Sequence, residues 1–141
     1  MTVQSTPMKS LALQLLANRL LRQFLIFASV GVVATGVHYT ILILLVERGG
    51  LAPVIATTIG LLVGAIVSYT LNRRLTFEAR PAVGSSFAKF LGLGSLGAGM
   101  NAGIVAGLSA LHVHYLLAQA VATCIVLFWN YFSARYFVFR D

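Results

Sequence analysis

Three arginines are the residues of this chain best suited to bind an anionic ligand. Arg73 and Arg74 follow the second of its apolar stretches, and Arg135 follows the last. A guanidinium group is permanently charged and pairs with two phosphate oxygens at once, so these side chains are candidates for binding a phosphate ester. The neighbouring amide of Asn72 is placed in the same candidate site. The alternative is that these arginines only anchor helix ends at a membrane surface.

A second group of candidates consists of polar side chains inside the apolar stretches. We predict that His38, Ser68, Asn101 and Asn130 line a polar pathway or contact a polar headgroup. Hydrogen bonding between helices is the alternative role, because an unpaired polar group is costly in hydrocarbon. For His38, the ionisable member, a proton site and a packed neutral imidazole are both open.

Aromatic residues accompany the arginines. Tyr69, Trp129, Tyr131 and Tyr136 fit a belt of aromatic side chains at a membrane interface, and stacking on sugar rings is the alternative. Neither a nucleotide-binding loop, a nucleophile motif nor a pair of carboxylates is found, so we predict no enzyme and no cofactor. No metal site is expected either, because His112 and His114 provide too few ligands.

Long windows without charge predict the elements that carry these residues. Of 141 residues, 59% are hydrophobic and 9% are charged, and a membrane-spanning helix needs roughly 20 apolar residues. Charge is absent from Gln23 to Val46, from Gly49 to Asn72 and from Phe90 to Ala134, and the third window needs a break near His112–His114. A soluble helical bundle would need charged outer faces, which these stretches lack. The predicted spans are residues 24–46, 52–71, 88–111 and 115–133.

The distribution of cations predicts the orientation. Nine of the ten lysines and arginines precede the first span, lie between the second and third, or follow the fourth; the exception is Arg48. By the positive-inside rule, both termini are cytoplasmic. The net charge of +7 then suits anionic lipid better than nucleic acid.

The N-terminal segment is predicted to be a separate tail. We divide the chain into a cytoplasmic tail, residues 1–21, and a membrane domain, residues 22–141. Leu11, Leu15, Leu16 and Leu20 fall on about one helical face, which is typical of an interfacial amphipathic helix. A signal peptide is the rival interpretation, and the apolar run is short for one.

The membrane domain is predicted to be an internal repeat of residues 22–80 and 87–141. A shift of 66 aligns Phe24 with Phe90 and Gly31 with Gly97, and a shift of 62 aligns Arg73 with Arg135. Because each unit holds two spans, both units face the same way. The predicted fold is an all-α membrane protein of four transmembrane helices arranged as two parallel two-helix repeats.

Small residues at intervals of four predict where the spans pack. They lie in the second, third and fourth spans: Ala56, Gly60, Gly64 and Ser68; Ser95, Gly99, Gly103 and Gly107; and Ala118, Ala122, Val126, Asn130 and Ala134. Such rows allow helix backbones to approach closely in lipid.

From Arg22 to Arg140 the chain resembles the GtrA-like family of small four-span membrane proteins. The resemblance rests on Phe24–Gly31, on Asn72–Phe77 and on Asn130–Phe139. The chain departs from the family pattern at Ala134, where asparagine would match Asn72. It departs again at His38, where an acidic residue is usual.

The resemblance implies a role in cell-surface polysaccharide or glycolipid synthesis in the bacterial cytoplasmic (inner) membrane. The implied activity is movement of a polyprenyl-phosphate-linked sugar across that membrane. A non-transporting scaffold for a glycosyltransferase and a small multidrug-type exporter are the alternatives. Four helices cannot enclose a glycan headgroup, so we expect a homo-oligomer or a partner such as a membrane glycosyltransferase, besides membrane lipids and a polyprenyl-phosphate-type lipid.

Overall fold

The computed structural model describes residues 6–140, and every regular element in that range is helical. There are four long helices, α1 (Thr6–Glu47), α2 (Pro53–Leu71), α3 (Val83–Ala110) and α4 (Tyr115–Ser133), and two short π-helical segments, η1 (Asn72–Thr76) and η2 (Ala134–Val138). Each long helix is long and apolar enough to cross a membrane. The prediction of an all-helical, four-span membrane protein is therefore confirmed.

The turn between α1 and α2 and the turn between α3 and α4 lie where the sequence predicts them. Gly50 has a φ of 64° in the first turn, a conformation that glycine adopts without strain. Pro53 begins α2, where its missing N–H is of no consequence. In the second turn, His112 has a φ of 60°, and the side chain of His114 accepts a hydrogen bond from the backbone N–H of Leu116.

Two helices begin earlier than predicted. α1 is one unbroken helix from Thr6, so no helix boundary separates residues 6–21 from the first span; residues 1–5 of the predicted tail lie outside the described range. α3 begins at Val83 rather than near residue 88. Hydropathy detects where charge interrupts an apolar stretch, but Arg19, Arg22 and Lys89 are good helix formers and the helices continue through them.

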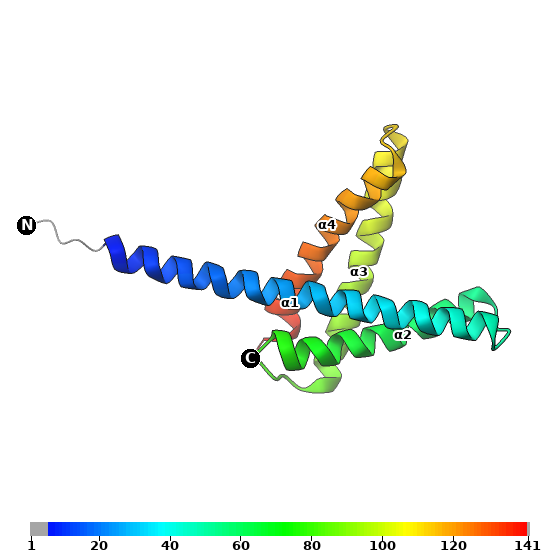
Figure 1. Cartoon of the computed structure of the whole chain (residues 1–141), viewed down its shortest axis with the longest axis horizontal. Coiled ribbons are helices and arrows are strands. Elements are labelled where there is room, and N and C mark those ends of the chain that lie inside the picture. Colours follow the sequence, from blue (N-terminus) through cyan, green and yellow to red (C-terminus); the bar gives the residue numbers. More distant parts are fainter. Residues whose placement is uncertain (1–5, 141) are drawn as a thin grey trace, which may run out of the picture.

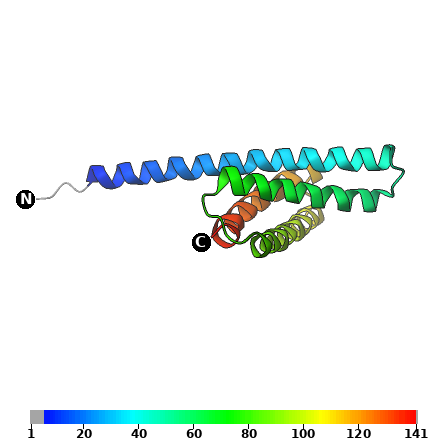
Figure 2. The ribbon, with the colours of Figure 1, turned by 90° about the horizontal axis from the view of Figure 1, so that it is seen from below.

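The helices form two antiparallel hairpins, α1 with α2 and α3 with α4. The hairpins lie in two layers that cross steeply, and the α1–α2 turn and the α3–α4 turn point apart (Figures 1 and 2). They meet at one end, where α1 near Gln23, the segment Asn72–Pro81 and the C-terminal segment Ala134–Arg140 come together. We refer to this end as the basic end.

Small residues hold each hairpin together, largely as predicted. Ala56 is fully buried on α2, and a Cβ atom at Gly64 would lie 3.1 Å from the backbone oxygen of Ala34 on α1. Ala118 and Ala122 are fully buried on α4. The row on α3 differs, because a Cβ atom at Gly99, Gly103 or Gly107 would meet nothing within 4 Å. These three glycines therefore make no close packing contact with the rest of residues 6–140.

An aromatic core lies where the hairpins meet. Phe77 and Phe139 stack with ring centroids 4.8 Å apart, and Tyr69 and Tyr131 flank this pair. Phe27 closes the cluster from α1. Tyr69 and Tyr131 are only 4% and 3% exposed, so both lie in the core and not in the predicted interfacial belt. The crossing of the hairpins buries them, because it brings the ends of α2 and α4 together.

Candidate functional site

The three predicted phosphate-binding arginines, Arg73, Arg74 and Arg135, belong to the two π-helical segments. In each segment the backbone N–H of the following phenylalanine bonds to the carbonyl five residues earlier: Phe77 to Asn72 at 3.0 Å and Phe139 to Ala134 at 2.8 Å. The segments start 62 residues apart, which is the register that aligns Arg73 with Arg135. Both arginines thus occupy the second position of a π turn.

Arg73 and Arg135 are both hydrogen-bonded within the protein and are only partly exposed. Arg73 donates to the backbone oxygen of Pro81 at 2.6 Å and to the Tyr69 hydroxyl at 3.3 Å, ahead of α3. Arg135 donates to Oε1 of Gln23 on α1, which also accepts from the Tyr131 hydroxyl at 3.0 Å. Sequence reasoning missed Gln23, although it is the polar residue that opens the first uncharged window.

Asn72 is not available to a ligand. Its side chain is fully buried; its Oδ1 accepts from the Thr76 hydroxyl at 2.7 Å, and its Nδ2 donates to the Ser68 hydroxyl at 3.3 Å. The predicted phosphate contact of Asn72 is thus replaced by a helix-stabilising one. The side chain of Asn72 is on the buried side of this stretch, whereas that of Arg74, two residues later, is exposed.

The exposed positive charge at the basic end comes mainly from other arginines. Arg74 lies with Arg19, Arg22 and Arg80 around a groove of about 250 Å³. Arg135 lies with Arg19 and Arg140 around an adjoining groove of about 280 Å³. The acidic residue in both is Glu78, whose carboxylate pairs with Arg19 at 2.6 Å. Sequence reasoning treated Arg19, Arg22, Arg80 and Arg140 as topology signals; the fold gathers them on one surface.

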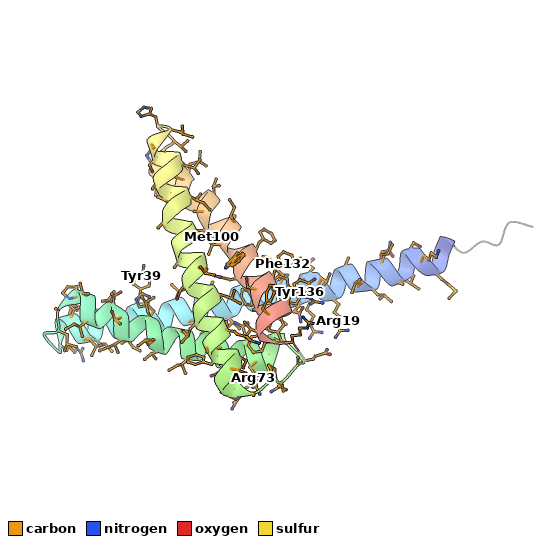
Figure 3. All side chains as sticks on the ribbon, turned by 180° about the vertical axis from the view of Figure 1, so that it is seen from behind. Arg19, Tyr39, Arg73, Met100, Phe132 and Tyr136 are labelled. Carbon is orange, nitrogen blue, oxygen red and sulfur yellow. The ribbon has the colours of Figure 1, made fainter. Side chains whose placement is uncertain are left out.

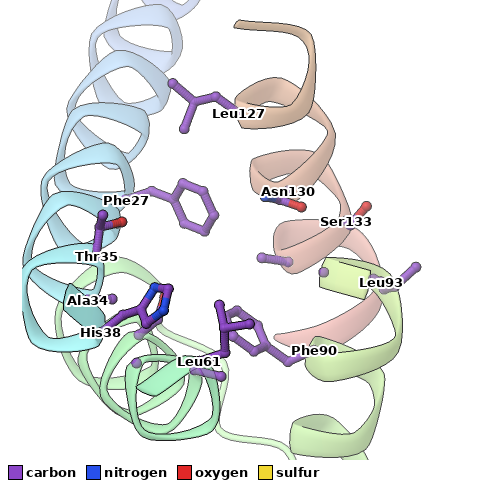
Figure 4. A pocket seen from close by; sticks show the side chains of 16 residues that line it. Phe27, Ala34, Thr35, His38, Leu61, Phe90, Leu93, Leu127, Asn130 and Ser133 are labelled. Carbon is purple, nitrogen blue, oxygen red and sulfur yellow. The ribbon is translucent and has the colours of Figure 1, made fainter. Parts of the chain in front are cut away.

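A cleft opens between the two hairpins, with residues from all four helices on its walls. Its two adjoining compartments measure about 310 Å³ and 790 Å³, in the range of small-molecule sites. Thr35 and Asn130 line both compartments, His38 and Ser68 the first, and Asn101 the second. Figure 4 shows Thr35 and His38 facing Asn130 and Ser133 across the first. All four predicted pathway residues thus line one cleft.

A comparison with known families matches most of the chain to one of them. Residues 26–139, which include the cleft and both π segments, match the GtrA/DPMS transmembrane domain. The chain belongs to this family. It is therefore a multi-pass membrane protein of a kind that fits glycolipid or polysaccharide synthesis.

Polar groups in the cleft of this GtrA/DPMS domain are partly satisfied by side chains outside the cleft. Nε2 of His38 lies 3.2 Å from the Thr57 hydroxyl, and Asn101 accepts from the Gln119 amide at 3.1 Å. Oδ1 of Asn130 is buried and has no hydrogen-bond partner among residues 6–140. Ser68 and Asn72 bond to each other, whereas the aligned pair is Asn130 and Ala134. The family departure at Ala134 therefore leaves Asn130 without a corresponding contact.

The aromatic core separates the cleft from the basic surface. Phe27 lines the cleft, while Phe77 and Phe139 line the basic grooves on the other side. Trp129, also assigned to the belt, is half-buried and donates its indole N–H to the backbone oxygen of Leu93 at 3.0 Å. Tyr136 is exposed, with Arg135 over its ring, and lies near Arg19 at the basic end (Figure 3). Of the four predicted belt residues, Tyr136 has the exposure that a belt requires.

Proposed function

We propose that this protein moves a polyprenyl-phosphate-linked sugar across the bacterial cytoplasmic membrane, acting as a transporter and not as an enzyme. The observation that carries the proposal is the polar cleft between the hairpins. Its walls bring together Thr35, His38, Ser68, Asn101 and Asn130 within otherwise apolar helices.

The chemistry of the cargo matches such a cleft. Transferring a hydroxyl group into hydrocarbon without a hydrogen-bond partner costs roughly 2–7 kcal/mol, and a sugar carries several. Hydroxyl, amide and imidazole groups on the cleft wall replace part of the lost hydration. The hairpins diverge from the end where they meet (Figure 1), so the polyprenyl chain can stay in lipid while the sugar passes.

The basic end supplies the charge that the phosphate requires. Arg135, which is partly exposed, lines a groove there together with further arginines, and charge-assisted bonds to phosphate are about twice as strong as neutral ones. This arrangement favours both termini on the cytoplasmic side, where the lipid-linked sugar would be collected. It suits a cationic drug exporter poorly, because the residues lining the cleft include no aspartate or glutamate.

The test is translocation of a labelled polyprenyl-phosphate sugar in liposomes, measured with a reagent that does not cross the membrane. Thr35→Val removes one cleft hydroxyl at nearly constant volume, and Thr58→Val is the matched control, because Thr58 is an exposed threonine outside the cleft. We expect the first variant to be several-fold slower and the second unchanged. Translocation no faster than in protein-free liposomes, with lipid binding intact, would favour the glycosyltransferase scaffold.

A further inference from the structure

A second groove lies on the outer side of the first hairpin, away from the cleft. It measures about 510 Å³ and is lined by Leu21, Leu25, Val33, Leu71 and Leu75, with Arg22 at one end. Asn18 lies with Arg22 at that end; the polar residue farther along, Ser29, donates its hydroxyl to the backbone oxygen of Leu25 at 2.8 Å. The groove wall is therefore apolar.

This groove runs directly into the basic surface. Arg22, Ile26 and Leu75 line both it and the basic groove that holds Arg74 and Arg80. Within residues 6–140, the side chains of Arg22, Arg74 and Arg80 form no hydrogen bond or ion pair. Their positive charge is thus available to an external anion.

We propose that this combined surface holds one resident anionic phospholipid, which is distinct from the transported lipid. Its phosphate lies on Arg22 and Arg74, with Arg80 nearby, and one acyl chain lies along the groove between α1 and α2. The charge of the site selects an anionic headgroup, and the apolar wall selects a lipid over a free phosphate.

The length of the groove fits a phospholipid. From Arg22 to Val33 the helix rises about 16 Å, at 1.5 Å per residue. Half of a hydrocarbon core is about 15 Å, so the groove matches one acyl chain in one leaflet and is too short for a polyprenyl chain. The groove also faces away from the cleft, because the two are lined by different residues of α1.

The second hairpin lacks this site. By the registers of the repeat, Ala88 stands where Arg22 would be, and Tyr136 stands where Arg74 would be. We therefore expect one such lipid per chain, bound to the first hairpin.

The experiment measures retained lipid by native mass spectrometry of the full chain, with phosphatidylglycerol or phosphatidylethanolamine added. Phosphatidylglycerol should be retained preferentially, one per chain. The double variant Arg22→Gln/Arg74→Gln should weaken its binding about 30-fold. Lys89→Gln/Arg140→Gln removes the same charge elsewhere and should leave binding within about three-fold, since the site residues are intact. Ser29→Trp fills the groove without changing charge and should also reduce retention.

Several outcomes would overturn the assignment. Equal retention of phosphatidylethanolamine and phosphatidylglycerol would show that the arginines do not select an anionic headgroup. Equal losses in the two charge-matched double variants would make the attraction a general property of the basic end. Displacement of phosphatidylglycerol by polyprenyl phosphate at equal concentration would assign the groove to the carrier lipid. None of these depends on translocation, so the lipid site and the proposed transport can fail separately.

Discussion

Replacement of Gly60 by alanine should loosen the first hairpin. A Cβ atom there would lie 2.6 Å from the imidazole Cδ2 of His38 and 2.8 Å from the His38 backbone oxygen. The ring can rotate, but the backbone oxygen can be avoided only if α1 and α2 move apart. Overpacking of this kind costs about 1–3 kcal/mol, and the higher helix propensity of alanine returns about 0.5–1 kcal/mol. The expected net loss is about 1–2 kcal/mol.

The matched control is Gly36→Ala, on α1 of the same hairpin. A Cβ atom at Gly36 would meet nothing within 4 Å, so this variant gains the higher helix propensity of alanine without a steric clash. Unfolding of both variants in mixed micelles, followed by circular dichroism, should separate them by about 2 kcal/mol in the free energy of unfolding. Equal stability of the two would refute the close approach of α1 and α2 at Gly60.

Three further predictions concern packing, assembly and topology. Asn72→Ala leaves the Thr76 hydroxyl without its buried acceptor and should lower the free energy of unfolding by about 1 kcal/mol, measured in mixed micelles; no loss would mean that the bond is dispensable. Gly103→Leu should weaken a detergent-stable homodimer while the monomer stays folded, because a Cβ atom at Gly103 meets nothing within 4 Å among residues 6–140; an unchanged mass by light scattering would rule out that face as the subunit contact. Gly97→Leu, which meets Asn130 within the chain, should instead unfold the second hairpin. A reporter fused after Asp141 should lie in the cytoplasm, and a periplasmic signal would reverse the proposed orientation.

The spans could be predicted from sequence because their ends are marked by charge, proline or glycine. Pro53 and the turn at His112 lie where the uncharged windows required a boundary. The early start of α1 could not be predicted in this way, because an arginine interrupts hydropathy without interrupting a helix.

The candidate site was predicted in part. His38, Ser68, Asn101 and Asn130 stood out as polar residues in apolar helices, and their common cleft results from the crossing of the hairpins, which no single-helix pattern encodes. The same crossing buries Tyr69, whose position beside an arginine suggested an interface. The predicted repeat held a usable signal, since Tyr69 and Tyr131, like Phe77 and Phe139, share a register of 62 and all four lie in the aromatic core.

The π-helical segments each hold one residue more than an α-helical turn needs. The N–H of Phe77 bonds to the carbonyl five residues earlier, at Asn72, where an α turn would join residues four apart. Deleting one residue between Asn72 and Phe77 would therefore convert the π segment into an α turn and leave Phe77 near its stack with Phe139. Elsewhere in the four long helices a deletion would rotate everything beyond it by about 100°. A change of one residue in length should thus be better tolerated in these two segments than in the helices that precede them.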